Sequence, residues 1–187
     1  MKEIDRMDGS AGMDLQPTLE GETLHLRPLR VEDFDALYAV AADPAIWDQH
    51  PEPTRFQRLV FEGFFTAALA SRGALLATDR ASGTVIGSSR YYDWNPAERS
   101  VAIGYTFLAR SHWGGAANRE MKRLMLDHAF RWADTAWFHV GKDNHRSRRA
   151  MEKLGAELAR ETQREHGGVL QDYVYYRIGR DGWSPSA

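Results

Sequence analysis

A strand, a glycine-rich corner, a helix and a second strand follow one another between residues 100 and 141, and this order constrains the fold more than any other stretch. SVAIGYTFL places apolar residues at alternate positions, as in a half-buried strand: Val101, Ile103, Tyr105 and Phe107. The corner SHWGGAAN leads into apolar residues at helical spacing, and TAWFHVGK is typical of the next strand. A helix between two strands of one sheet predicts a parallel pair with a right-handed crossover.

The rest of the chain predicts antiparallel strands on both sides of this unit. The expected elements are a strand over 21–30, helices over 31–44 and 54–73, strands within 74–94, a basic helix over 144–155, and strands near 156–165 and 172–179. This order favours an α/β (α+β) fold with a mixed central sheet of about seven strands and helices on both faces.

Length and composition predict one globular domain. The chain has 187 residues, of which 43% are hydrophobic and 27% charged, enough to bury a substantial core. Residues 1–20 are rich in Gly, Asp, Met and Ser without periodicity, so we expect a flexible N-terminal arm followed by a single domain over 21–187.

Charge and residue usage exclude several kinds of partner. Lys and Arg number 24 against 26 Asp and Glu, so a net charge of -2 gives no reason to expect nucleic acid. No apolar run approaches the roughly 20 residues of a membrane span, and the polar N-terminus lacks the apolar region of a signal peptide. There is no cysteine, and the seven histidines show no metal-ligand spacing. We therefore expect a cytoplasmic protein without membrane, nucleic acid or metal.

The corner SHWGGAAN, residues 111–118, suggests contact with an anion. A helix N-terminus carries unpaired N–H groups and a partial positive charge, and small residues before it let phosphate oxygens approach. A glycine corner also serves simply as a turn between strand and helix. The corner alone does not decide between these interpretations.

A second motif, DNHRSRRAMEKLGA, opens a helix after the next strand, at the same end of the sheet. Together the two segments resemble the GNAT superfamily of acyl-CoA-dependent N-acetyltransferases, in the branch of the ribosomal-protein N-terminal acetyltransferases. The pyrophosphate loop of that family matches at Gly114 and Ala116, and its next motif matches in five places: Asn144, Ser147, Glu152, Lys153 and Gly155. The resemblance covers roughly residues 21 to 180.

The resemblance implies acetyl-CoA as co-substrate and direct attack of an amine on its thioester. The residues it implies for the cofactor are Phe107, Leu108, Arg110, Trp113, Gly114, Gly115, Ala116, Ala117, Asn118, Asn144, Ser147 and Arg149. Arg149 also fits a solvated helix face. Ser147 is expected to hydrogen-bond the leaving thiolate or the pantetheine arm.

Two departures from the family pattern concern the chemistry. Met151 stands where many members carry the tyrosine that protonates the thiolate, and the strand before the corner has no carboxylate at Ala102, Gly104 or Thr106. The base must come from elsewhere, or act through water. Asp93, Asp172 and Tyr92 are candidates, because they lie at strand ends that frame the acceptor cleft in this family.

The lack of an obvious general base affects which acceptor amines are favoured. Deprotonating a lysine-like amine at pH 7 costs roughly 4.6 kcal/mol, whereas an α-amine near pKa 8 costs about 1.4 kcal/mol. Amines of low pKa are therefore favoured, including peptide N-termini and amino sugars such as aminoglycoside antibiotics. A non-catalytic acyl-CoA-binding domain stays as the alternative, and a homodimer is left open.

Overall fold

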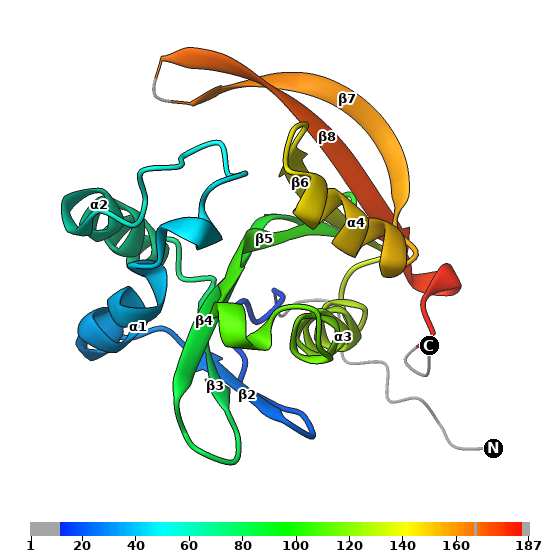
Figure 1. The fold of residues 1–187 in the computed structure, drawn as a ribbon. Helices are drawn as coiled ribbons and strands as arrows, with labels where there is room; N and C mark the ends of the chain where they lie inside the picture. Colours follow the sequence, from blue (N-terminus) through cyan, green and yellow to red (C-terminus); the bar gives the residue numbers. More distant parts are fainter. Residues whose placement is uncertain (1–11, 167, 185–187) are drawn as a thin grey trace.

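The computed structural model describes residues 12–166 and 168–184 (Figure 1). Its strands are β1 (Leu19–Glu20), β2 (Leu24–Pro28), β3 (Ala74–Asp79), β4 (Val85–Asn95), β5 (Ser100–Leu108), β6 (Thr135–Gly141), β7 (Glu157–His166) and β8 (Val169–Gly179). Its α-helices are α1 (Phe34–Ala41), α2 (Arg58–Ala70), α3 (Ala117–Ala129) and α4 (His145–Lys153).

All strands of the described chain form one mixed sheet in the order β1-β2-β3-β4-β5-β6-β8-β7. Only β5 and β6 pair in parallel among the described strands, which confirms the parallel pair expected on either side of α3. The sheet has eight strands instead of about seven, because Leu19 and Glu20 pair with β2. Met13 is buried in the core, so packed residues occur before residue 20, whereas residues 1–11 of the expected arm lie outside the described part.

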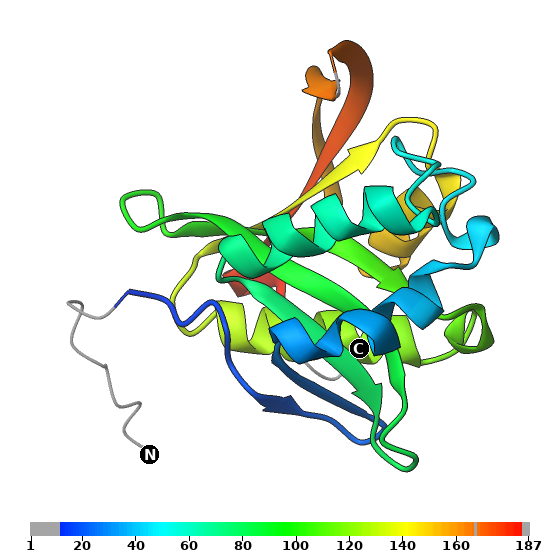
Figure 2. The ribbon, with the colours of Figure 1, turned by 90° about the vertical axis from the view of Figure 1, so that its left-hand side faces the viewer.

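Helices cover both faces of the sheet, as predicted (Figure 2). On one face α3 packs its apolar side, including Met121 and Met125, against the central strands. On the other face α1 and α2 build a second, largely aromatic cluster around Phe61 and Phe65. No helix in the described part of the chain is long and apolar enough to cross a bilayer.

The second helix begins later than its sequence pattern suggested. We expected it from Thr54, but a turn occupies residues 53–56 and the N-cap of α2 is Gln57. The Thr54 N–H and hydroxyl are instead bound to the Glu52 carboxylate. Arg55 consequently lies in a loop and is buried, rather than on an exposed helix face.

The parallel pairing of β5 and β6 is short. Only Ser100, Val101 and Ala102 pair with residues of β6, although β5 extends to Leu108 and β6 to Gly141. A bulge also interrupts β5 against β4, where Tyr105 and Thr106 stand opposite the single residue Ser89. Tyr105 has φ +52° at this bulge, and its side chain is 42% exposed. The two strands therefore diverge toward their carboxyl ends and leave a space between them.

Candidate functional site

A cavity of about 740 Å³ occupies the space where β5 and β6 diverge, and we call it the β5–β6 cavity. Its lining comes from these strands, from Tyr92 of β4, from the N-terminal part of α3, from most of the length of α4, from the loop before α2 and from β7 and β8. The predicted site residues that line it are Tyr92, Phe107, Leu108, Trp113, Gly114, Gly115, Asn118, Asn144, Ser147 and Arg149. The two sequence motifs are thus brought to one cavity.

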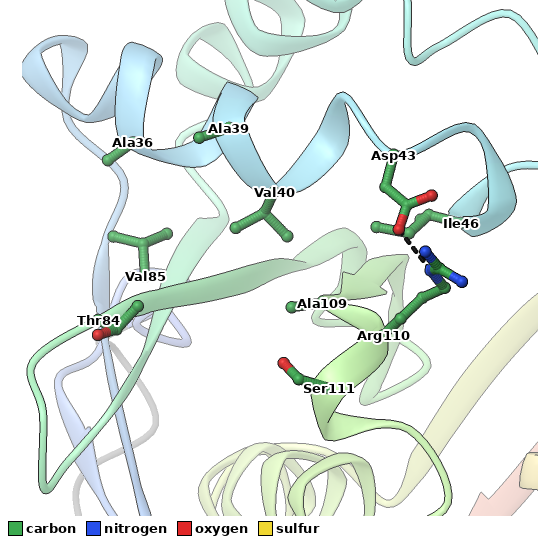
Figure 3. Close-up of a pocket in the computed structure, with 10 residues that line it drawn as sticks. All are labelled: Ala36, Ala39, Val40, Asp43, Ile46, Thr84, Val85, Ala109, Arg110 and Ser111. Carbon is green, nitrogen blue, oxygen red and sulfur yellow. Dashed lines mark hydrogen bonds and ion pairs between the residues drawn. The ribbon is translucent and has the colours of Figure 1, made fainter.

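The other predicted residues lie elsewhere. Ala116 is the N-cap of α3, and Ala117 packs into the core. Arg110 lines a separate pocket of about 570 Å³ beneath α1, where its guanidinium pairs with Asp43 (Figure 3). Asp93 and Asp172 are both exposed and do not line the cavity. Asp172 instead accepts a hydrogen bond from Gln163 across the β7–β8 hairpin, at 2.9 Å.

The glycine corner is shaped by one backbone conformation and one aromatic anchor. Gly114 has φ +71°, a left-handed value that side chains rarely adopt, and its face is open. The Trp113 indole N–H donates to the Leu108 carbonyl at 2.9 Å, and the Arg146 guanidinium lies 4.1 Å from the Trp113 ring centroid. Because Ala116 has no side-chain acceptor, the first N–H groups of α3 stay available to an anion.

At the second motif, Asn144 has a clear structural function. Its side-chain oxygen accepts a hydrogen bond from the Ser147 N–H at 3.0 Å and so caps α4. Its own N–H donates to the Gly141 carbonyl at 2.9 Å, which fixes the exit of β6. The cap places Ser147, in the first turn of α4, at the wall of the cavity.

Comparison with known proteins identifies the family. The family model described as an acetyltransferase (GNAT) domain matches residues 23–157, more than half of the chain. The chain belongs to the GNAT acetyltransferase family. It is thus an N-acetyltransferase by family, as the two motifs suggested. No curated protein sequence matches it significantly.

Solved GNAT structures resemble it over most of their length. A GCN5-related N-acetyltransferase from Brucella melitensis is 22% identical, with a TM-score of 0.77, over 90% of this chain and 80% of that one. RimJ from Mycobacterium smegmatis, solved with CoA-disulfide, is 20% identical, with a TM-score of 0.67, over 84% and 82%. Spermidine N-acetyltransferase from Vibrio cholerae, solved with CoA and spermine, is 19% identical, with a TM-score of 0.67, over 87% and 98%. At these identities the likeness shows the GNAT fold alone.

The β5–β6 cavity also contains a buried lysine, Lys122, which the sequence analysis did not identify as a site residue. Lys122 of α3 is 4% exposed and lines the cavity floor, where its Nζ donates to Thr106 Oγ1 at 2.6 Å. Burial lowers the pKa of this amine to about 7. The only sequence signal was a charge within the apolar stripe of α3, next to Met121. Near neutral pH, Lys122 is therefore present in both the charged and the neutral form.

A histidine on the face opposite α3 was missed as well. His139 of β6 contacts the Tyr92 hydroxyl and the Arg164 guanidinium through Nδ1, at 3.0 and 3.2 Å, and stacks on Tyr175 at 3.8 Å. Burial, and then the charges of Arg164 and Arg160, lower the pKa of His139 to about 4. Burial raises the pKa of Tyr92. At neutral pH both groups are therefore uncharged.

Among the described residues, no group of three or more His, Asp or Glu side chains is arranged to hold a metal ion.

Few carboxylates lie near the end of the cavity that contains Tyr92 and His139. Glu165 lines it and is exposed, and Glu52 acts on Arg55 through its charge. The polar wall here consists mainly of tyrosine, histidine and arginine side chains.

The predicted contact between CoA and the glycine corner can be tested by adding a side chain at Gly114. We expect Gly114→Val to weaken binding of CoA at least tenfold, because a branched side chain would both strain the φ +71° backbone and cover the approach to α3. Gly83, in the turn before β4, has the same φ and an equally open face but does not line the cavity. Gly83→Val is the matched control, and calorimetric titration with CoA is the measurement. Equal affinities of the two variants would rule out the corner as a binding surface.

Lys122 should make stability depend on pH. Its folded pKa of about 7 lies below the ordinary 10.5, so the unfolded chain binds more protons between these values. The free energy of unfolding should rise with pH through this window and be lowest below it. We expect Lys122→Met to raise that free energy by about 2 to 4 kcal/mol at pH 6.5, with the gain shrinking toward pH 10. Urea unfolding from pH 6.5 to 10 measures this, and parallel curves for the two proteins would contradict it.

Proposed function

We propose that this GNAT protein uses acetyl-CoA to acetylate a primary amine in the β5–β6 cavity, within the branch that its motifs resemble. The observation that carries the proposal is the divergence of β5 and β6 between the glycine corner and the Tyr92–His139 pair. One cavity joins a surface suited to phosphate with a polar wall suited to an amine. The RimJ and spermidine N-acetyltransferase structures, both solved with CoA species, support this use of the fold.

The lining fits the parts of an acyl-CoA. Phosphates suit the N–H groups of α3 and the nearby cations of the lining, which are Arg119, Arg146, Arg149 and Lys153. The pantetheine arm contains amides and methyl groups. It suits the edge of β5 that no longer pairs with β6 after Ala102, and the apolar lining formed by Ile103, Leu108, Phe138, Val140 and Met151.

The proposed chemistry is attack of a neutral amine on the thioester carbonyl, with the thiolate leaving. Ser147, in the first turn of α4, is proposed to donate a hydrogen bond to the leaving sulfur. His139 is neutral at pH 7, and with Tyr92 it offers a short relay that orients the amine and passes its proton to water. Asp93 and Asp172 have no part in the proposal, because both are exposed outside the cavity lining.

The acceptor is proposed to be a small molecule or peptide with an amine of low pKa. No carboxylate lines the bulge region of β5 in the described structure, so a lysine-like amine would lack a strong base. Cytoplasmic location and a homodimer stay predictions.

The function is tested with purified protein, acetyl-CoA and amines chosen to span a range of pKa. We expect thiol release above background, fastest for amines with a pKa near 8, followed by a thiol-reactive dye. Release of no thiol with any amine, from protein that still binds CoA, would favour the non-catalytic acyl-CoA-binding alternative.

Ser147→Ala separates leaving-group stabilisation from cofactor binding. We expect kcat to fall about tenfold with little change in the dissociation constant of CoA, because the hydroxyl acts where charge develops on sulfur. The cap is preserved, since it uses only the backbone N–H of Ser147. Ser184→Ala, at an exposed serine outside both the lining and the glycine corner, is the control. An equal loss in turnover and affinity would point to a binding function instead.

A further inference from the structure

Two buried arginines lie beside the acceptor end of the cavity. Arg55, in the loop before α2, and Arg90, on β4, are each 6% exposed. Their guanidinium carbons lie 4.4 and 5.6 Å from the Phe64 ring centroid. In the described part of the chain, the Nε of each is buried and has no hydrogen-bond partner. Burying an N–H donor without a hydrogen-bond partner costs free energy, so these two Nε groups need an explanation.

Arg55 is the arginine of this pair that reaches the cavity. It lines the wall, stacks over Trp47 at 5.1 Å, and places Nη1 3.1 Å from His50 Nε2. Arg90 stays behind the wall, with its guanidinium 4.2 Å from the Tyr105 ring centroid. Both guanidinium groups lie against aromatic faces, and the Nε donor of each has no hydrogen-bond partner in the described structure.

A third arginine faces the same space from the opposite side. Arg164 of β7 lines the cavity, contacts His139 at 3.2 Å, and lies 5.7 Å from the Tyr173 ring centroid. Tyr173 is close enough to feel the charges of both Arg55 and Arg164. The two guanidinium groups therefore lie near the same tyrosine of the cavity lining.

Positive charge is only partly offset at this end, where Glu52 acts on Arg55 through its charge and the exposed Glu165 lines the cavity. In the described chain, no ion pair within 4.0 Å involves Arg55, Arg90 or Arg164. Burial lowers the pKa of Arg55 only to about 10, so it stays charged at neutral pH. A desolvated guanidinium with free donors suits a carboxylate, which it binds through two parallel hydrogen bonds. A second ammonium placed here would be repelled.

We propose that Arg55, assisted by Arg164, binds a carboxylate of the acceptor, so the acceptor is an amine that also carries a carboxylate rather than a polyamine or an aminoglycoside. This inference rests on the proposed acetyltransferase function and narrows its substrate class. Free amino acids and peptides with an acidic N-terminal residue share this chemistry. The carboxylate lies at the arginines, and the amine then points toward Tyr92 and His139.

The test compares acceptors with and without a carboxylate, with each kcat/KM referred to the concentration of the neutral amine. The panel holds α-amino acids with their methyl esters, a peptide beginning with Asp with its Asn counterpart, and spermidine. We expect the acceptor that carries the carboxylate to have at least a tenfold higher kcat/KM than its uncharged counterpart, either among the amino acids or between the two peptides. We expect no acetylation of spermidine. The pair that shows the preference distinguishes a free amino acid from a peptide. Equal or faster acetylation of esters or spermidine would overturn the proposal.

Arg55→Gln assigns the preference to the residue. We expect kcat/KM for the carboxylate acceptor to fall at least thirtyfold and that for the ester less than threefold, with CoA affinity unchanged. Arg58→Gln removes the same charge from an exposed arginine at the start of α2 that pairs with Asp35 and Glu62, and it should behave as wild type. A loss that is equal for all acceptors, or that falls on CoA affinity, would overturn the assignment.

A binding measurement keeps this proposal separate from the function. N-acetylated forms of the amino acids and the acidic peptide, with their uncharged counterparts, are titrated calorimetrically in the presence of CoA. We expect binding of a carboxylate form only, lost in Arg55→Gln and weakened in Arg164→Gln, whose half-buried side chain makes misfolding less of a concern. Binding without thiol release would refute the proposed catalysis alone, whereas equal affinity for charged and uncharged forms would refute the carboxylate site alone.

Discussion

The early end of the parallel pairing between β5 and β6 is the constraint on which the rest of the site depends. After Ala102 the facing edges of the strands separate, and the bulge at Tyr105 and Thr106 turns β5 further from regular pairing. An ordinary sheet would have filled this space with ladder hydrogen bonds. Here the space becomes a cavity that reaches from the glycine corner to the tyrosine wall, and every proposed contact is made across it.

The sequence predicted the local geometry of the site where that geometry is set within a few residues. A left-handed Gly114, a short corner before α3 and an asparagine cap on α4 are all set within a few residues, so the motifs carried them. Arg110 shows the limit of the same reasoning. It is adjacent in sequence to the corner, yet an ion pair with Asp43 holds it in another pocket.

The residues that were missed owe their character to long-range packing. Nothing near Arg55 in the sequence shows that α2 begins only at Arg58, and its aromatic neighbours come partly from α2 itself. Lys122 is unusual because of Thr106 and Phe138 on two different strands. The positions of Asp93 and Asp172 were not predicted for a related reason. Their strands were predicted, but the sequence did not show that both side chains would be exposed outside the cavity.

The arginines also bear on the missing base. The surroundings of His139 disfavour positive charge, because burial and the charges of Arg164 and Arg160 lower the pKa of His139 to about 4. The same surroundings disfavour an ammonium beside it and so lower the pKa of an entering amine. A drop of about one to two units would bring a peptide α-amine with pKa near 8 to 7 or below, so half or more of it would be unprotonated at pH 7. The positive wall that selects a carboxylate would then also deliver a neutral nucleophile, and a dedicated carboxylate base would work against both.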